Sequence, residues 1–187
     1  MDVARLWPRS RGVTLLELLT TLSTGLVLLG IGIPGWRVIV ESNAVSTSRS
    51  QFQTVLAQGR MLAVKNQLPA TICPTRDGDS CNGDFEAWHQ GYILFVDRDG
   101  SRQREGDEPV IRWVQQVEAG VIIHSSSGRR SIRFDGDGNA WGSNVSLRFC
   151  GPSGERSNKA LILYGSGRAR RSDTLPGGDP VVCEDLS

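Results

Sequence analysis

The sequence predicts an α+β fold, in which a long N-terminal helix, first transmembrane and then amphipathic, packs on an antiparallel β-sheet domain. Three observations support this prediction. Residues 13–33 form an apolar run, residues 52–63 carry apolar side chains at helical spacing, and the chain from residue 70 alternates short β-branched runs with Gly, Asp and Ser. With 187 residues and a net charge of +1, the chain has room for one modest domain plus one extra element.

The first element is an apolar helix behind a short basic leader. Residues 1–12 form the leader, which contains Arg5, Arg9 and Arg11 against a single acid, Asp2. Residues 13–35 can cross a membrane, because about 20 helical residues span a hydrocarbon core. By the positive-inside rule, the arginines predict a cytoplasmic N-terminus and place the chain after the apolar run on the other side of the membrane. A cleaved secretory signal fits poorly, since its apolar core is shorter and ends at a small-residue site.

Glu17 is the sole ionisable residue of the apolar run. A carboxylate inside a membrane is costly, so it marks a function and requires a partner. The alternative is a position close enough to the cytoplasmic interface for the carboxylate to stay hydrated. The residues alone leave both interpretations open.

The second part of the helix, residues 36–68, is expected to be amphipathic. We expect Pro34 and Gly35 to kink the helix rather than stop it, and the Leu68–Pro69 step to end it. Its apolar positions recur at threes and fours: Phe52, Val55, Leu56, Gly59, Leu62 and Ala63.

Residues 69–187 are expected to form the antiparallel β-sheet domain. The strand-like runs are 91–100, 109–117, 120–125, 131–141, 145–150 and 160–170. Five aromatic residues are expected to pack in the core or on a sheet face rather than stack on a ligand: Trp88, Trp113, Trp141, Phe95 and Phe134.

The four cysteines, Cys73, Cys81, Cys150 and Cys183, all follow the apolar run. None forms a C-x-x-C pair or lies beside a histidine, which argues against zinc. An even number beyond a membrane segment indicates disulfides in an oxidising compartment. Of the three possible connectivities we favour Cys73–Cys81 with Cys150–Cys183, the second of which would pin the C-terminal tail. Four free thiols in a cytosolic domain are the alternative.

The N-terminal residues carry a family resemblance. Arg11-Gly12 followed by "VTLLELL", and then an apolar run interrupted by Pro34, resembles the signature of type IV pilins and type II secretion pseudopilins. The resemblance implies that a prepilin peptidase cuts after Gly12 and that Val13 becomes the N-methylated first residue. It also supplies a partner for Glu17, the new N-terminal amine of a neighbouring subunit in a filament. The family usually has Phe where this chain has Val13.

The segments "YILFVDRDG", "DEPVIRW", "IRFDGDGNA" and "GSGRARR" resemble the GspH/FimT family of minor pilins and pseudopilins. That resemblance implies a pilin-like α+β fold, present in few copies at or near a filament tip. The implied localisation is the inner membrane, with one pass and a periplasmic domain, before assembly into a periplasmic or surface filament. The implied partners are other pilin or pseudopilin subunits, the prepilin peptidase and the membrane.

The most informative outer stretch is "GSGRARR", residues 165–171. Arg168 and Arg170 alternate onto one strand face and Arg171 follows, so two or more guanidinium groups could reach one phosphate backbone. Gly167-Arg168-Ala169-Arg170 resembles a Gly-Arg-x-Arg motif that the transformation branch of the family associates with binding double-stranded DNA. The alternative is a solvated edge strand, or arginines paired with the acidic tail. Four further arginines could extend the surface if their strands are neighbours: Arg129, Arg130, Arg133 and Arg148.

Catalysis has little support in the sequence. The two histidines lie in separate segments, and no cysteine–histidine or serine–histidine arrangement is readable, so no enzyme activity and no cofactor are predicted. Residues 97–108 and 135–146 suggest calcium loops, but Arg102 and Ala140 replace Gly at position six, and only the first loop closes with Glu, at Glu108. Asp-Gly turns account for both stretches, so no metal site is predicted.

The sequence therefore predicts a processed minor pilin or pseudopilin subunit of a type IV pilus or type II secretion pseudopilus. The alternative is a DNA-binding minor pilin for natural transformation. A third interpretation is a membrane protein that is never assembled. Nothing in the residues decides which machine the subunit serves.

Overall fold

The computed structural model describes residues 12–126 and 128–183, so most of the leader predicted at 1–12 and the acidic residues Glu184 and Asp185 lie outside the described residues. The chain divides into two compact units, Met1–Arg37 and Val38–Ser187. One α-helix, α1 (Leu15–Asn66), contributes residues to both units.

Helix α1 begins at a side-chain cap. The backbone N–H of Glu17 donates to Thr14 Oγ1 at 3.2 Å, and Thr14 with Glu17 three residues later matches the spacing of a capping box. Glu17 thus lies in the first turn, where the helix dipole favours a negative charge. At the other end, Gln67 turns into the left-handed region with φ 54°, and the helix ends before the expected Leu68–Pro69 step.

In the first unit, the described side chains of α1 are exposed. Val13, Leu15 and Leu26 are 68%, 79% and 70% exposed. By length and composition alone, α1 contains a segment that is apolar enough to cross a membrane, and none of that segment is buried within the chain.

In the second unit, the part of α1 from Val38 onward buries the predicted apolar face. Phe52, Val55, Leu56 and Ala63 are at most 2% exposed. Gly59 is also buried, and a Cβ there would come within 3.3 Å of Leu94 and Phe134. The helical spacing of the apolar residues is confirmed.

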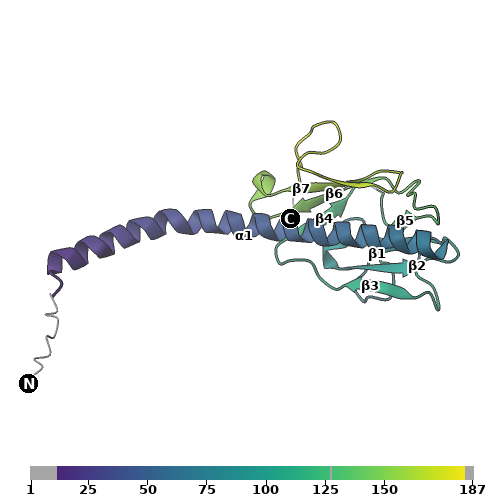
Figure 1. The fold of residues 1–187 in the computed structure, drawn as a ribbon, viewed down its shortest axis with the longest axis horizontal. Helices are drawn as coiled ribbons and strands as arrows, with labels where there is room; N and C mark the ends of the chain where they lie inside the picture. Colours follow the sequence, from purple (N-terminus) through teal and green to yellow (C-terminus); the bar gives the residue numbers. More distant parts are fainter. Residues whose placement is uncertain (1–11, 127, 184–187) are drawn as a thin grey trace, which may run out of the picture. The chain divides into compact units, whose positions relative to one another are not determined.

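The strands form two four-stranded antiparallel sheets (Figure 1). Sheet A has the order β3-β2-β1-β5 and sheet B the order β4-β6-β7-β8. Sheet A contains β1 (Ala70–Pro74), β2 (Tyr92–Val96), β3 (Val110–Val114) and β5 (Ile132–Phe134). Sheet B contains β4 (Ile122–Ser125), β6 (Val145–Cys150), β7 (Lys159–Leu163) and β8 (Ala169–Ser172). Two short 3₁₀ helices cover Trp88–Gln90 and Gly154–Arg156.

The inner faces of both sheets and the apolar face of α1 share one core. Alternate residues of sheet A, such as Ile72 and Leu94, and of sheet B, such as Phe149 and Leu161, belong to the same buried cluster as Phe52. This arrangement confirms the α+β prediction of a long helix packed on antiparallel sheet.

Each sheet also carries a disulfide on its outer face. Cys73 and Cys81 are bonded with their Cα atoms 5.6 Å apart, beside a second buried cluster that contains Ile93 and Phe95. Cys150 and Cys183 are bonded with a Cα separation of 6.2 Å. Both favoured pairings are present, and no cysteine is free.

The tail from Asp173 to Cys183 covers the outer face of sheet B. The side chain of Asn158 donates to the carbonyl of Val181 at 2.9 Å, and Arg148 donates to the carbonyl of Val182 at 3.2 Å. Ile162 lies on this outer face yet is only 3% exposed. The Cys150–Cys183 bond therefore pins a segment that buries apolar surface.

Three local expectations need correction. The run 160–170 is two strands joined by a turn, and the buried strand β1 was not anticipated as a separate element. Trp141 is 65% exposed and lies in a turn rather than in the core or on a sheet face, although a Cβ at Gly165 would come within about 3 Å of its ring. Trp113 is 45% exposed but packs on the outer face of sheet A, as expected, since a Cβ at Gly78 would meet its ring. The other aromatic residues expected in the core, Trp88, Phe95 and Phe134, are fully buried.

Candidate functional site

The Gly-Arg-x-Arg stretch lies on the hairpin between β7 and β8. Tyr164 closes the hairpin, since its N–H donates to the carbonyl of Arg168 at 3.0 Å and its own carbonyl accepts from Gly167 at 2.9 Å. Residues 165–167 form the turn, and β8 pairs antiparallel with β7 in register Leu163↔Ala169. Gly and Ser in this turn supply the conformational freedom that a tight connection requires.

Packing accounts for the glycine of this stretch. Gly167 has φ +74°, and a Cβ built on it would lie 2.1 Å from the carbonyl oxygen of Gly138, so no side chain fits. Arg60 on α1 also donates to the carbonyl of Gly167 at 3.5 Å. Gly167 thus fixes where the hairpin crosses the 135–139 turn, and this position sets the start of the arginine-bearing strand.

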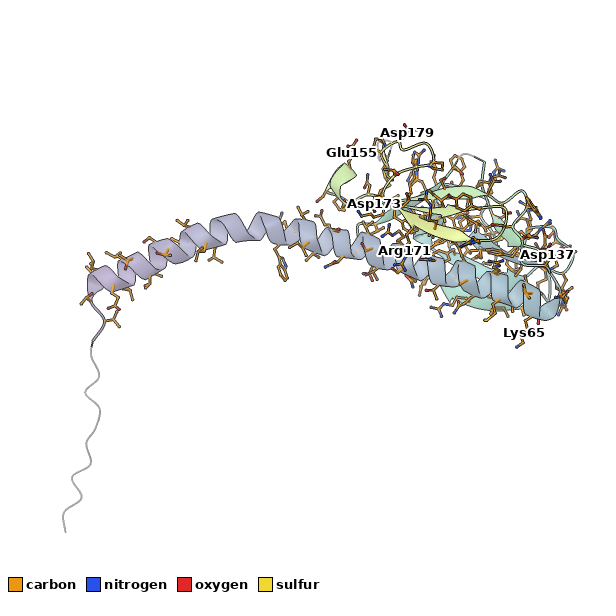
Figure 2. The ribbon with its side chains drawn as sticks, turned by 45° about the horizontal axis from the view of Figure 1, so that its top comes forward. Lys65, Asp137, Glu155, Arg171, Asp173 and Asp179 are labelled. Atoms are coloured by element: carbon orange, nitrogen blue, oxygen red, sulfur yellow. A yellow bond between two sulfur atoms is a disulfide. The ribbon has the colours of Figure 1, made fainter. Side chains whose placement is uncertain are left out.

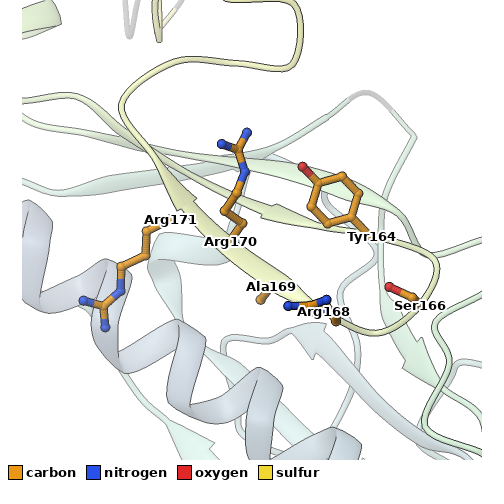
Figure 3. A pocket seen from close by; sticks show the side chains of 6 residues that line it. All are labelled: Tyr164, Ser166, Arg168, Ala169, Arg170 and Arg171. Atoms are coloured by element: carbon orange, nitrogen blue, oxygen red, sulfur yellow. The ribbon is translucent and has the colours of Figure 1, made fainter.

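The strand directs its arginines to two different faces. Ala169 packs on the core, so alternation along β8 places Arg170 on the opposite, outer face. Arg168 directly precedes β8 and also lines a second depression with Gln53 of α1. Arg171 shares the side of Ala169 and donates through Nε to Gln53 on α1. Figure 3 shows Arg170 and Arg171 directed away from each other. Of the three predicted arginines, Arg170 lies on the outer face, Arg171 lies on the side of α1, and Arg168 lies at the start of the strand, where it borders both sides.

A shallow depression of about 600 Å³ follows this strand edge. Its lining residues are Tyr164, Ser166, Arg168, Ala169, Arg170 and Arg171 (Figure 3). An exposed aromatic ring beside guanidinium groups is a surface that suits phosphate and base contacts.

The described acidic residues of the tail do not neutralise the outer arginines. Asp173 instead contacts Lys159 at 3.0 Å and Arg49 at 3.6 Å. The hydrogen bond from Lys159 is the main reason that the pKa of Asp173 lies below its ordinary value. Asp179 lies farther along the tail (Figure 2). Among the described residues, no ion pair or side-chain hydrogen bond includes Arg168 or Arg170.

Three of the four other arginines expected to extend this surface have different roles, while Arg130 is exposed. Arg133 is on β5 in sheet A, where it pairs with Asp135 at 3.1 Å and donates to the carbonyl of Gly100. Arg129 donates to the carbonyl of Gly142. Arg148 shares the outer face of sheet B but is half-buried and donates to the tail. The free basic surface is therefore narrower than the sequence suggested.

The predicted processing and assembly residues lie at the start of the first unit. Gly12 precedes α1, and a Cβ placed on it would meet no atom within 4 Å in the part of the chain that the structure describes. Val13 is exposed and Glu17 lies one turn into the helix. Pro34 lies within α1, and its side chain is outside the described part of the chain.

Comparisons with known proteins agree on a family and a fold. A family model described as type II transport protein GspH matches residues 48–171. The chain resembles the type IV minor pilin FimU of Pseudomonas aeruginosa with a TM-score of 0.56 and 16% identity, over 72% of this chain and 92% of that one. A second crystal form of FimU gives a TM-score of 0.53 and 14% identity, over 68% and 91%.

A third solved structure is the minor pseudopilin EpsH from the type 2 secretion system of Vibrio cholerae. Its TM-score is 0.48 at 9% identity, over 68% of this chain and 94% of that one. No curated protein matches the chain in sequence. At these identities the FimU structures establish the fold, a long N-terminal helix followed by antiparallel sheets.

Proposed function

Because the chain belongs to the GspH family of minor pilins and pseudopilins, we propose that it is processed after Gly12 and assembles into a filament through the first part of α1. Members of this family are structural subunits, not enzymes. The observation that carries the proposal is the exposed apolar surface of residues 13–30, with Glu17 in its first turn. Apolar surface of that extent needs lipid or a neighbouring helix to cover it.

Glu17 is proposed to set the register of assembly. Cleavage after Gly12 would create an amine at Val13, and the capped first turn holds the carboxylate of Glu17 one turn further along. In a low dielectric, a carboxylate and an amine from adjacent subunits are each tolerable only with the other. The membrane holds the subunit until this contact forms. Neighbouring subunits in the filament then cover the apolar surface that lipid covered before.

The proposed topology has a cytoplasmic N-terminus and a periplasmic second unit. Two disulfides in the second unit suit an oxidising compartment. Trp36 is 68% exposed just beyond the apolar run, where an indole ring favours the membrane–water interface.

The test is a Glu17→Ala variant expressed in cells that hold the rest of the assembly machinery. We expect cleavage after Gly12 to remain complete, read as the mass of the mature chain, while crosslinking into filaments is lost. Glu118→Ala is the matched control, because Glu118 is an exposed carboxylate in the second unit. Wild-type crosslinking of the Glu17→Ala chain would refute the proposed role.

A second candidate function is capture of double-stranded DNA, favoured by two exposed guanidinium groups along one strand that have no side-chain partner among the described residues. Arg168 and Arg170 border the depression beside Tyr164. Contacts of this kind are sequence-independent and weaken steeply with salt, since they release condensed counterions.

The test for DNA capture uses the full chain in detergent micelles and fluorescence anisotropy with duplex DNA across a salt series. Arg168→Ala/Arg170→Ala should weaken binding and lower the salt slope by about two. Lys65→Ala/Arg112→Ala removes the same charge from exposed positions elsewhere and should leave binding near the wild-type value. Equal losses in the two double variants would exclude a specific site, and absence of binding at low salt would exclude DNA capture.

A further inference from the structure

The loop between β2 and β3 brings three carboxylates together. Asp97, Asp99 and Glu108 each place an oxygen within 4.8 Å of the other two. Oxygens that bind one Ca²⁺ at 2.3–2.6 Å can lie no more than roughly 5 Å apart, so the cluster has the dimensions of a single cation site. Asp97 is fully buried, Glu108 is 5% exposed, and Asp99 opens to solvent.

The loop has the spacing of a twelve-residue calcium loop. Asp97, Asp99 and Glu108 occupy positions one, three and twelve. Position six, where such loops have Gly for a sharp turn, is Arg102, which argued against the site in the sequence. In the structure Arg102 nevertheless has φ 65°, and its N–H donates to Asp97 Oδ2 at 3.2 Å. The turn that Gly normally supplies is therefore present.

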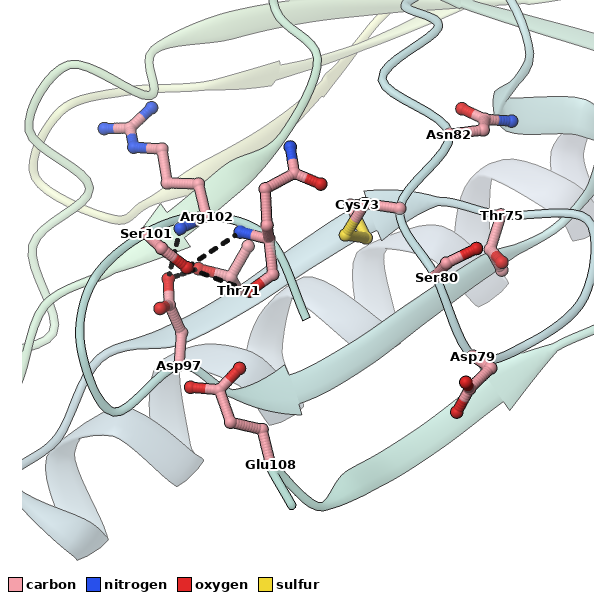
Figure 4. Close-up of a disulfide and its surroundings, with 12 residues drawn as sticks. Thr71, Cys73, Thr75, Asp79, Ser80, Asn82, Asp97, Ser101, Arg102 and Glu108 are labelled. Carbon is pink, nitrogen blue, oxygen red and sulfur yellow. Dashed lines mark hydrogen bonds between the residues drawn. A yellow bond between two sulfur atoms is a disulfide. The ribbon is translucent and has the colours of Figure 1, made fainter. Parts of the chain in front are cut away.

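Asp97 presents a buried oxygen without a partner. Its Oδ2 accepts hydrogen bonds from the Thr71 hydroxyl at 2.6 Å and from the N–H of Arg102, which fix the side chain. Its Oδ1 is buried and has no hydrogen-bond partner among the described residues. Figure 4 shows the carboxylates of Asp97 and Glu108 side by side at the base of the loop. An unsatisfied buried carboxylate oxygen is costly, so this atom requires a ligand.

The arginines of the loop do not supply the missing positive charge. Arg98 pairs with Asp107 at 3.1 Å, and Arg104 pairs with Asp79 in the disulfide-closed loop. The guanidinium group of Arg102 is directed away from Asp97 (Figure 4). No ion pair found in the described ranges includes Asp97, Asp99 or Glu108.

A proton on Asp97 is the alternative to a bound cation at this cluster. Burial raises the pKa of Asp97, and the charges of Glu108 and Asp99 add to this effect. Glu108 is held differently, because one of its oxygens accepts the N–H group of Arg98 at 2.7 Å and the other accepts that of Glu105 at 3.1 Å. A proton on Asp97 would satisfy one oxygen and leave the other two carboxylates facing each other.

We propose that Asp97, Asp99 and Glu108 bind a hard divalent cation, Ca²⁺, at the β2–β3 loop. Asp97 Oδ1 and one oxygen from each of the other two carboxylates are the protein ligands, and water entering beside Asp99 completes the coordination. The ion holds the two ends of the loop together where β2 ends and β3 begins. The proposal is independent of the filament and DNA functions.

The experiment uses the full chain in detergent, stripped with EDTA, dialysed and titrated with CaCl₂ by calorimetry, with thermal unfolding measured in parallel. We expect one Ca²⁺ per chain and a higher Tm in its presence. Asp99→Asn should weaken binding by about tenfold or more. This variant keeps the buried residues intact, so folding is not at risk. Asp97→Asn should abolish binding.

Asp107→Asn is the matched control, since Asp107 is an exposed carboxylate of the same loop that pairs with Arg98. Its affinity for Ca²⁺ should stay near the wild-type value. Two outcomes would overturn the proposal. One is the absence of both heat and a Tm shift up to about 10 mM Ca²⁺, beyond the weakest calcium modules. The other is an equal loss in Asp107→Asn and Asp99→Asn, which indicates diffuse attraction to acidic surface.

Discussion

Residues 15–30 and residues 45–63 belong to one continuous helix, but their apolar side chains have opposite exposure. In the first stretch every described large apolar side chain is exposed. In the second, Phe52, Val55 and Leu56 are buried against sheet. The helix is continuous across both stretches, but its apolar surface is covered in different ways. The second stretch packs on other parts of the chain, whereas the first requires lipid or another subunit to cover it.

The prediction with the largest expected effect tests whether the prepilin peptidase acts just before the first stretch. Gly12→Val should abolish cleavage by the prepilin peptidase, measured as the mass of the chain from cells that express both proteins. A Cβ at Gly12 meets no atom of the described residues within 4 Å, so a steric clash with them would not explain the loss. Val13→Phe, which restores the usual family residue, should be cleaved normally. A cleaved Gly12→Val chain would show that the cut lies elsewhere.

The next effect compares one core residue with one exposed residue of the same helix. Phe52 lies with its ring centroid 4.7 Å from Tyr92 and 5.5 Å from Trp88, so Phe52→Ala should cost about 3 to 5 kcal/mol in the free energy of unfolding of the second unit. Leu22 is 58% exposed, and Leu22→Ala should change that free energy by less than about 0.5 kcal/mol. Denaturant titration followed by tryptophan fluorescence measures both. Similar costs would mean that the first stretch also packs within the chain.

A third prediction concerns the disulfides, which belong to the second unit. Cys150→Ser/Cys183→Ser should cost about 3 to 4 kcal/mol in the free energy of unfolding, because the bond closes 33 residues. Cys73→Ser/Cys81→Ser should cost about 2 to 3 kcal/mol, since that bond closes eight. Denaturant midpoints measure which double variant loses more stability. A larger loss of stability for Cys73→Ser/Cys81→Ser would contradict the prediction.

The smallest effect is a pH dependence within the second unit. The pKa of Asp173 is lower in the folded chain than in the unfolded one, so its ionised form stabilises the fold. That stability is present above the ordinary aspartate pKa and is lost as pH falls through the folded value. Because Asp173 is largely exposed, Asp173→Asn should cost less than about 1 kcal/mol at pH 7, and this cost should shrink as pH falls through the folded pKa of Asp173. A constant Tm difference across pH would exclude this charge effect.

Much of the fold could be predicted because periodicity reports which side of an element is buried. The 3.6-residue spacing around Phe52 identified the buried face of α1. It could not identify β1, since Ala70–Pro74 is buried on both faces and shows no alternation. The β7–β8 hairpin was hidden for another reason. Its turn is only Gly165, Ser166 and Gly167, so the two strands read as one run.

The candidate site was predicted less completely, because the contacts of a side chain depend on the face of the strand on which it lies. Spacing placed Arg168 and Arg170 on one strand, but it could not show the hydrogen bond from Arg171 to Gln53, which joins residues 118 positions apart. The sequence does not predict the proposed cation loop, because position six lacks Gly. A non-glycine residue in the left-handed region, such as Arg102, is visible only in coordinates. The Asp97, Asp99 and Glu108 spacing was the available signal.

The tail that Cys183 pins across sheet B has a consequence for the order of biogenesis. Ile162 is buried although it faces outward, and the covering residues, such as Val181, follow every strand of the sheet in the chain. Sheet B can therefore pair before its cover is in place, and until then its outer apolar face is open to solvent. Oxidation of Cys150 and Cys183 holds the cover on this face. The interval between strand pairing and disulfide formation thus sets how long this apolar surface is available for aggregation.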